Sequence, residues 1–249
     1  MNSIVCVKRV PDTEARIRIS GDGKTIDPGG VKWVMNPYDE FAVEAALKHR
    51  EAAGSGDVTV LTVGQADSAE TLRTGLAMGA DQAVLLKTAD RVEGLAVASA
   101  IAAEVKDREF DLLLFGMKAI DDDLQAVGAM VAELLGLPSA TVVTEFSVEG
   151  DTVVAHREIE GGTEIVEMKK PCVITVTKGA YEPRYASLKG IMAAKKKPLE
   201  EKDADARGAG VTTEKLSYPA EREAGRIVGE GPDAVPELLR LLRQEAKVL

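Results

Sequence analysis

The stretch FDLLLFGMKAIDDDLQAVGAMVAELLGL, residues 110–137, indicates the fold more clearly than any other part of the sequence. It opens with an apolar run, residues 112–115, that is too short for a free-standing helix and is bounded by charged residues and glycine. Such a run is typical of a strand buried on both faces of a parallel sheet. Gly116 ends the run, a polar segment follows, and apolar residues then recur at helical spacing, so the sequence predicts a helix from near Leu124.

The polar segment between strand and helix is a candidate nucleotide site. A buried strand, a glycine, a polar loop and a helix N-terminus form a common nucleotide-binding corner in α/β proteins, although an ordinary βα connection has the same order. The loop carries Lys118 and three aspartates, Asp121, Asp122 and Asp123. Because carboxylates repel phosphate, we expect main-chain N–H groups, Lys118 and Gln125 to hold the phosphate while the carboxylates face ribose hydroxyls or capping N–H groups. Neither a GxGxxG nor a GxxxxGK[ST] motif is present.

Composition argues against several classes of function. The net charge of −10 disfavours a nucleic-acid binder. No run approaches the length of a membrane span and the first ten residues lack a signal-peptide core, so we expect a cytoplasmic protein without direct membrane insertion. Cys6 and Cys172 each lie in an apolar run and are predicted to be buried thiols. His49 and His156 show no metal-ligand spacing, so we predict neither a metal site nor hydrolase chemistry.

The first part of the chain repeats one strand–helix alternation. Strands are predicted at residues 3–7, 57–63 and 82–86, helices from Pro37 and at 68–78 and 92–105, and a hairpin excursion at 16–27. The βαβαβαβα order predicts a right-handed, mostly parallel doubly wound sheet of the adenine-nucleotide α-hydrolase-like kind, with helices on both faces. The strand ends near Cys6, Val63 and Gly116 should meet at the carboxyl edge of this sheet, and Asn36 at a helix start can join them.

After Pro138 the pattern changes to short β-rich segments with tight glycine-containing turns, near residues 139–178. We predict strands at residues 140–148, 152–159, 163–168 and 172–177, the last in a position to return to the main sheet. This part of the sequence predicts a β-rich insertion.

The segment 181–198 combines exposed apolar residues with the basic run 195–197, which indicates a docking surface. A short surface helix with a solvated basic end is the alternative. Residues 199–212 are polar and rich in glycine and alanine, which predicts a linker or extended arm. A final helix is predicted at 236–248, with Leu238, Leu239, Leu241, Leu242 and Val248 on it. The predicted division is thus an α/β domain at 1–198 and an arm with a helix at 199–249.

Six segments carry a resemblance to a known family. They are VCVKRVPD at 5–12, VMNPYDEFAVEAAL at 34–47, LRTGLAMGAD at 72–81, GMKAIDDD at 116–123, REIEGG at 157–162 and EPRYASLKGIMAAKKKP at 182–198. In this order they resemble the β subunit of electron-transfer flavoprotein. The resemblance covers about the first 200 residues, and the last segment is its most specific part.

The resemblance implies a heterodimer with an α subunit and one FAD held mostly by that subunit. Such a carrier, which has no catalytic residues of its own, accepts electrons from acyl-CoA dehydrogenases of fatty acid β-oxidation and from related flavoenzymes. It passes them to a membrane quinone oxidoreductase. The family's β subunit binds AMP at the carboxyl edge, and the matching residues are Cys6, Asn36, Pro37, Tyr38, Asp39, Val63, Gly116, Met117, Lys118, Ala119, Ile120, Asp121, Asp122, Asp123, Leu124, Gln125, Ala126 and Val127.

The sequence departs from the AMP-binding pattern after the aspartates. Family members usually have Asn-Gln-Thr there, whereas this chain has Gln125, Ala126 and Val127. An electron-bifurcating branch binds a second FAD in place of AMP and uses NADH. This chain shares Val127 and Gly128 with that branch but keeps Asp122, where the branch usually has glycine. The resemblance therefore leaves AMP and a second FAD as alternatives.

The resemblance also implies partner-binding residues. Leu188 matches an anchor leucine that enters a pocket of the partner dehydrogenase, with Tyr185, Ile191 and Met192 beside it. Glu158 matches a glutamate that holds the mobile flavin domain of the α subunit, on which the C-terminal arm is expected to pack. A function of another class, a stand-alone adenine-nucleotide-binding enzyme, would need a phosphate loop after the first strand, yet residues 8–12 contain no glycine.

Overall fold

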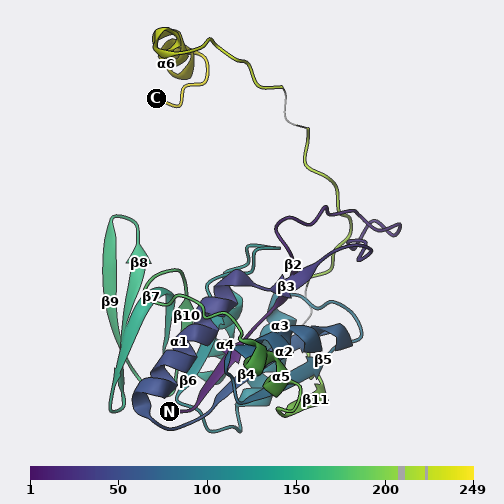
Figure 1. The fold of residues 1–249 in the computed structure, drawn as a ribbon, viewed down its shortest axis with the longest axis vertical. Coiled ribbons are helices and arrows are strands. Elements are labelled where there is room, and N and C mark those ends of the chain that lie inside the picture. Colours follow the sequence, from purple (N-terminus) through teal and green to yellow (C-terminus); the bar gives the residue numbers. More distant parts are fainter. Residues whose placement is uncertain (207–210, 222–223) are drawn as a thin grey trace. The chain divides into compact units, whose positions relative to one another are not determined.

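Within residues 1–206, a nine-stranded sheet has the order β11-β5-β4-β1-β6-β10-β7-β8-β9 (Figure 1). The computed structural model describes residues 1–206, 211–221 and 224–249. The strands are β1 Ser3–Cys6, β4 Val58–Gly64, β5 Gln82–Lys87, β6 Leu112–Gly116, β7 Ser139–Glu149, β8 Thr152–Ile159, β9 Gly162–Lys169, β10 Cys172–Val176 and β11 Leu199–Asp203. Neighbours from β11 to β7 are parallel, and β8 and β9 add an antiparallel hairpin. The predicted mostly parallel sheet is therefore confirmed.

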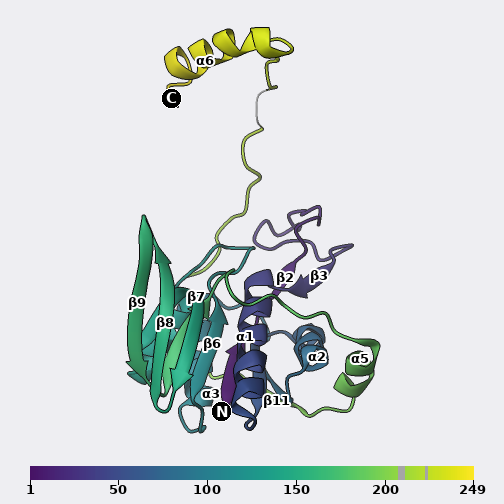
Figure 2. The ribbon, with the colours of Figure 1, turned by 60° about the vertical axis from the view of Figure 1, so that its left-hand side comes forward.

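Helices cover both faces of this sheet (Figures 1 and 2). Helices α1 (Pro37–Ala53) and α2 (Ala69–Met78) bury one apolar cluster, while α3 (Gly94–Val105) and α4 (Val127–Leu135) bury another. Successive strand side chains alternate between the two clusters, as Leu112 and Leu113 do in β6. Helix α5 (Leu188–Ala194) lies against α2.

The residues after β1 form strand β2 (Arg9–Pro11), which pairs antiparallel with β3 (Trp33–Met35). Two predictions in the first part of the chain need correction. The predicted hairpin at 16–27 is reduced to a single bridge between Ile19 and Ile26. Helix α4 begins at Val127 and not near Leu124; Asp123, just before Leu124, has a left-handed backbone with φ of 53°.

The predicted linker at 199–212 is wrong at its start, because residues 199–203 form strand β11 along the open edge of β5. Residues 207–210 of that linker lie outside the described residues. By internal contacts the chain forms two units, Met1–Glu214 and Lys215–Leu249. The second contains the 3-10 turn Pro232–Ala234 and helix α6 (Val235–Gln244), so the predicted helix ends before Val248.

Two other expectations concern residue environments. Cys6 and Cys172 are free thiols and both are buried, as predicted. Among the described residues, none of the helices combines the length and apolar character that a bilayer crossing needs.

Candidate functional site

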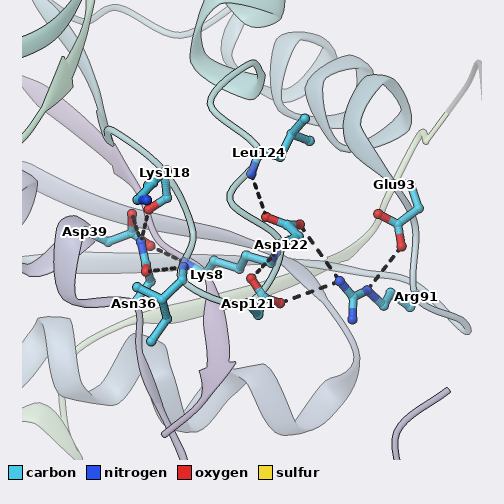
Figure 3. Close-up of polar contacts among 10 residues, drawn as sticks. Lys8, Asn36, Asp39, Arg91, Glu93, Lys118, Asp121, Asp122 and Leu124 are labelled. Atoms are coloured by element: carbon cyan, nitrogen blue, oxygen red, sulfur yellow. Dashed lines mark hydrogen bonds and ion pairs between the residues drawn. The ribbon is translucent and has the colours of Figure 1, made fainter. Parts of the chain in front are cut away.

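Asp39 connects the start of α1 to the carboxyl ends of two neighbouring strands (Figure 3). Its Oδ2 accepts the Lys8 main-chain N–H at 2.7 Å, and its Oδ1 accepts the N–H of Gly116 at 3.2 Å and the Asn36 Nδ2 at 2.9 Å. Burial raises the pKa of Asp39 to about 7 despite these donors. Burial, and then the neighbouring Asp39, raise the pKa of the Cys6 thiol well above its usual range. Asp39 therefore holds the start of α1 against the carboxyl ends of β1 and β6.

Asn36 fixes the loop that follows β6. Its Nδ2 also donates to the Lys118 carbonyl at 2.8 Å, and its Oδ1 accepts the Ile120 N–H at 3.1 Å. The side chain is 1% exposed, so these bonds form away from competing water. Asn36 thus sets the path of residues 117–120 across the carboxyl edge.

Gly116 is needed for helix packing at this edge. A Cβ placed there would lie 2.3 Å from the Asp39 Oδ1 and 2.6 Å from the Tyr38 carbonyl carbon. Glycine is therefore required at position 116 because the start of α1 packs against it, whether or not a ligand binds nearby. Gly128, at the start of α4, is similar, since its Cβ would lie 2.7 Å from the Thr175 Cγ2 on β10.

The aspartates of the loop are engaged by basic side chains from other segments (Figure 3). The Lys8 Nζ lies 2.7 Å from both the Asp121 Oδ1 and the Asp122 Oδ2. Arg91, in the loop after β5, places its Nη2 3.5 Å from the Asp121 Oδ2 and pairs through Nε with Glu93 at 3.2 Å. Sequence reasoning missed Lys8 and Arg91 as site residues. Lys8 could have been found, because it directly follows the first strand, whereas no local signal marks Arg91.

The remaining loop residues lead into α4. The Lys118 Nζ pairs with the Asp123 Oδ1 at 2.9 Å, and the Asp122 Oδ1 accepts the Leu124 N–H at 3.1 Å. Within the described residues no side chain caps the N-terminus of α4. The first main-chain N–H groups of this helix, together with nearby cations, are groups that can bind an anion.

The structure brings the predicted pocket residues to one edge. Cys6 and Val63 lie near the carboxyl ends of β1 and β4, Asn36, Pro37, Tyr38 and Asp39 at the start of α1, and Gly116, Met117, Lys118, Ala119, Ile120, Asp121, Asp122, Asp123, Leu124, Gln125, Ala126 and Val127 between β6 and the first turn of α4. Their accessibility differs, because Cys6, Asn36 and Asp39 are buried. Those three can shape a pocket without offering surface to a ligand.

The predicted partner-binding residues fall into two places. Leu188 is the first residue of α5 and is 83% exposed. Tyr185, Ile191 and Met192 are exposed beside it. Glu158 is exposed near the tip of the β8–β9 hairpin, at the other end of the sheet (Figure 2). The two regions can therefore contact different partners.

A metal centre finds no support in the described residues, which contain no group of three or more His, Cys, Asp or Glu side chains placed to hold an ion. The His156 Nδ1 instead lies 3.0 Å from the Glu145 Oε1. His49 packs 4.1 Å from the Phe146 ring and contacts the Tyr181 hydroxyl at 2.8 Å. Both histidines therefore have structural contacts.

Comparison with known proteins assigns similarity over the whole chain. The model of the electron transfer flavoprotein domain matches residues 24–207. The chain is 42% identical to the electron transfer flavoprotein subunit beta of Bradyrhizobium diazoefficiens and 41% identical to that of Bacillus subtilis, with all of each chain covered. The Sus scrofa subunit beta is 36% identical, covering all of this chain and 99% of the relative.

Proposed function

The chain belongs to the electron transfer flavoprotein family as a β subunit, a carrier and not an enzyme, and we propose the following electron path for it. With its α subunit it holds one FAD, most of whose contacts come from the α subunit. The pair accepts electrons from acyl-CoA dehydrogenases and related flavoenzymes and passes them to a membrane quinone oxidoreductase. Full-length similarity to β subunits and the exposed apolar residues of α5 support this path.

A structural AMP at the carboxyl edge is the second part of the proposal. One observation carries it: each carboxylate of the aspartate run is already paired with Lys8 or Lys118. These two lysines, with Arg91 beside Asp121, offset most of the negative charge of the three carboxylates, and the uncapped start of α4 offers main-chain N–H groups to a phosphate. The residues at this edge thus fit a mononucleotide, with residues 116–127 and Asn36 forming its surroundings.

A second FAD, with NADH as electron donor, is the alternative occupant. The observation in its favour is the valine at position 127. Valine has no hydroxyl that could bind a phosphate, and Val127 packs partly buried against the apolar cluster beneath α4. Against that, Asp122 is retained and holds both Lys8 and the Leu124 N–H. We therefore prefer AMP.

A stand-alone adenine-nucleotide enzyme has less support than either. The residues after β1 form strand β2, which pairs with β3, and do not form a phosphate-binding loop. Family membership also indicates an electron carrier.

The C-terminal unit is proposed to bind the α subunit. Helix α6 exposes Val235, Leu238 and Leu239, which gives it an apolar side that a partner can cover. Glu158 is proposed to hold the flavin domain of the α subunit.

Co-expression with an α subunit tests these proposals. We expect a yellow heterodimer, and a colourless or aggregated product when this chain is expressed alone. Denaturing the purified heterodimer and weighing the released nucleotides by mass spectrometry should give FAD and AMP in equal amounts. Two FAD per heterodimer without AMP would favour the bifurcating alternative, and stoichiometric FAD on the isolated chain would overturn the shared-flavin proposal.

A further inference from the structure

Helix α5, which carries the exposed Leu188, is too short to be stable by itself. It spans seven residues, whereas isolated helices below about 12–15 residues are marginal in water. Its start is capped by the Ser187 Oγ, which accepts the Gly190 N–H at 3.0 Å. A docking surface on this helix therefore depends on what holds the helix to the rest of the domain.

Gly190 allows α5 to lie directly on α2. A Cβ at this position would be 2.5 Å from the Ala77 carbonyl oxygen, so any larger residue would push the two helices apart. Ala194, at the end of α5, is 2% exposed and joins the core cluster that includes Leu76 and Ala77. One side of α5 is therefore packed while Leu188 and Met192 stay exposed.

Each of these two helices has its C-terminal carbonyls bound by a basic side chain from the other segment. Arg73 of α2 donates through Nη1 to the carbonyls of Ala194 at 2.6 Å and Lys197 at 2.9 Å. Lys197, just after α5, donates through Nζ to the carbonyls of Leu76 at 3.1 Å and Ala80 at 2.5 Å. Cations at helix C-termini bind otherwise unpaired carbonyls and favour the helix dipole.

This arrangement corrects the interpretation of the basic run 195–197. Lys195 and Lys196 are exposed and suit long-range attraction of an acidic partner, but Lys197 is half-buried and bound to main-chain carbonyls. Burial accordingly lowers the pKa of Lys197 from its ordinary value. The third lysine therefore belongs to the helix contact and is not part of the solvated run.

We propose that Arg73 and Lys197 are positioning residues for partner docking, which latch α5 onto α2 and present Leu188, Ile191 and Met192 in one fixed arrangement. This inference rests on the proposed docking role of α5. A preformed surface saves the ordering that a flexible segment undergoes on binding, so the latch lowers the concentration of partner needed without touching the partner. The chemistry of electron transfer inside the bound complex is unaffected.

The test uses the full heterodimer with Arg73→Met and Lys197→Met, which keep an unbranched side chain close to the backbone but remove the donors. Hydrogen exchange of the α5 amides reports the latch, and steady-state reduction by an acyl-CoA dehydrogenase reduced with its own substrate reports docking. We expect α5 exchange to quicken and the KM for the reduced dehydrogenase to rise, each by about five- to thirtyfold, with kcat unchanged. Arg73→Lys should recover part of both effects.

Lys196→Met is the matched control for Lys197→Met. It removes the same charge from an exposed neighbour, so α5 exchange should stay at the wild-type rate. Any increase in KM that it shares with Lys197→Met comes from charge alone and should disappear at high salt.

Two outcomes overturn the proposal. Unchanged α5 exchange in both variants would show that there is no latch. Faster exchange with an unchanged KM would show that helix order does not matter for docking. Leu188→Ala, run in parallel, separates this failure from failure of the proposed function, because a wild-type KM in Leu188→Ala would mean that α5 is not the docking surface at all.

Discussion

The guanidinium of Arg184 forms a two-point ion pair with the carboxylate of Glu44, Nε to Oε2 at 2.7 Å and Nη2 to Oε1 at 3.0 Å. Glu44 lies in the middle of α1 with a side chain only 3% exposed, and the Arg184 Nη1 also lies 2.7 Å from the Oε1 of Glu51, two turns later in the helix. The segment between β10 and α5 is thereby fastened across α1. A buried carboxylate and the path of the chain toward helix α5 therefore depend on one arginine.

Removing that arginine should leave Glu44 buried without its partner. We expect Arg184→Met to lower the free energy of unfolding by about 3 kcal/mol, the lower end for a broken buried pair, because the Arg184 side chain is 33% exposed. Urea denaturation near neutral pH measures this. The double variant Glu44→Leu/Arg184→Met should recover most of the loss, and a double variant as unstable as the single one would show that the pair is not the cause.

Leu188 should matter for electron transfer and not for stability. Burying a leucine side chain in a partner pocket is worth about 1.5–3 kcal/mol, so Leu188→Ala should slow reduction by an acyl-CoA dehydrogenase by roughly ten- to a hundredfold. FAD content and melting temperature should stay nearly unchanged, because the side chain is 83% exposed. Leu76→Ala, in the core, should instead cost about 2–5 kcal/mol of stability. Early melting of Leu188→Ala with normal transfer would contradict the docking role.

Asp39 should make stability fall as pH rises toward neutrality. Its pKa is about 7 when folded, against 3.8 for an ordinary aspartate, so between these values the folded chain keeps a proton that the unfolded chain has lost. The stabilisation is complete below the unfolded value and is lost as pH rises through about 7. Asp39→Asn removes the titrating group and with it this pH-dependent contribution to stability. The difference in melting temperature, wild type minus variant, should therefore decrease from about pH 5 to about pH 8. A difference in melting temperature that stays constant across this pH range would contradict the assigned role of Asp39.

Nucleotide retention should depend on Asn36 more than on Gln125. Asn36→Ala leaves the part-buried Lys118 carbonyl and Ile120 N–H without their partner, at about 1 kcal/mol for each group, so the loop should loosen and the nucleotide be lost. Gln125 is exposed, and Gln125→Ala should weaken retention by only about 1 kcal/mol. Chromatography of nucleotide released from the denatured heterodimer measures both. Gly116→Val is unsuitable as a probe because its side chain would strike Asp39. Full nucleotide content in Asn36→Ala would place the site elsewhere.

Helix α6 should contribute to assembly with the α subunit. Leu238 and Leu239 are both more than a third exposed, and burying each against a partner is worth about 1.5–3 kcal/mol. Leu238→Ala/Leu239→Ala should therefore raise the dissociation constant of the heterodimer at least about tenfold, as measured by analytical ultracentrifugation. Arg243→Ala, an exposed polar position of the same helix, is the control. Equal dissociation constants would rule out this contact.

The parallel sheet was predictable because its signals are local. The apolar run of β6 is fully buried, and Gly116 ends it at the residue where the pattern changes. Pro37 and Gly54 delimit α1 in the same way, since proline suits a first helical turn and glycine the left-handed cap with φ of 70°. Such signals involve residues that are close in the sequence, so they can be recognised without knowledge of the tertiary structure.

Strand β11 shows the opposite case. Its sequence, LEEKD, is polar and reads as a linker, yet its backbone pairs with β5 along the whole of its length. What makes it a strand is the open edge of β5, which is distant in sequence. An edge strand that exposes most of its side chains carries no alternating apolar pattern to detect.

The candidate site was predictable as a set of segments but not as a set of contacts. Parallel topology alone brings Cys6, Val63 and Gly116 to one edge. That Asp39 would face inward, or that Arg91 would reach the aspartates, depends on side-chain directions that no spacing encodes. The same holds for Lys197, whose role depends on carbonyls of another helix.

The position of β11 has a consequence for how the chain is made. It is the last strand to leave the ribosome but pairs with β5, which was completed more than a hundred residues earlier. Until residue 203 emerges, the nascent sheet has an unpaired parallel edge of the kind that invites contact with other chains. Once β11 adds to that edge this edge of the sheet is closed, and the unit Lys215–Leu249 emerges after it. Translation order thus allows the sheet domain to fold before helix α6, which we propose to bind the α subunit, has emerged.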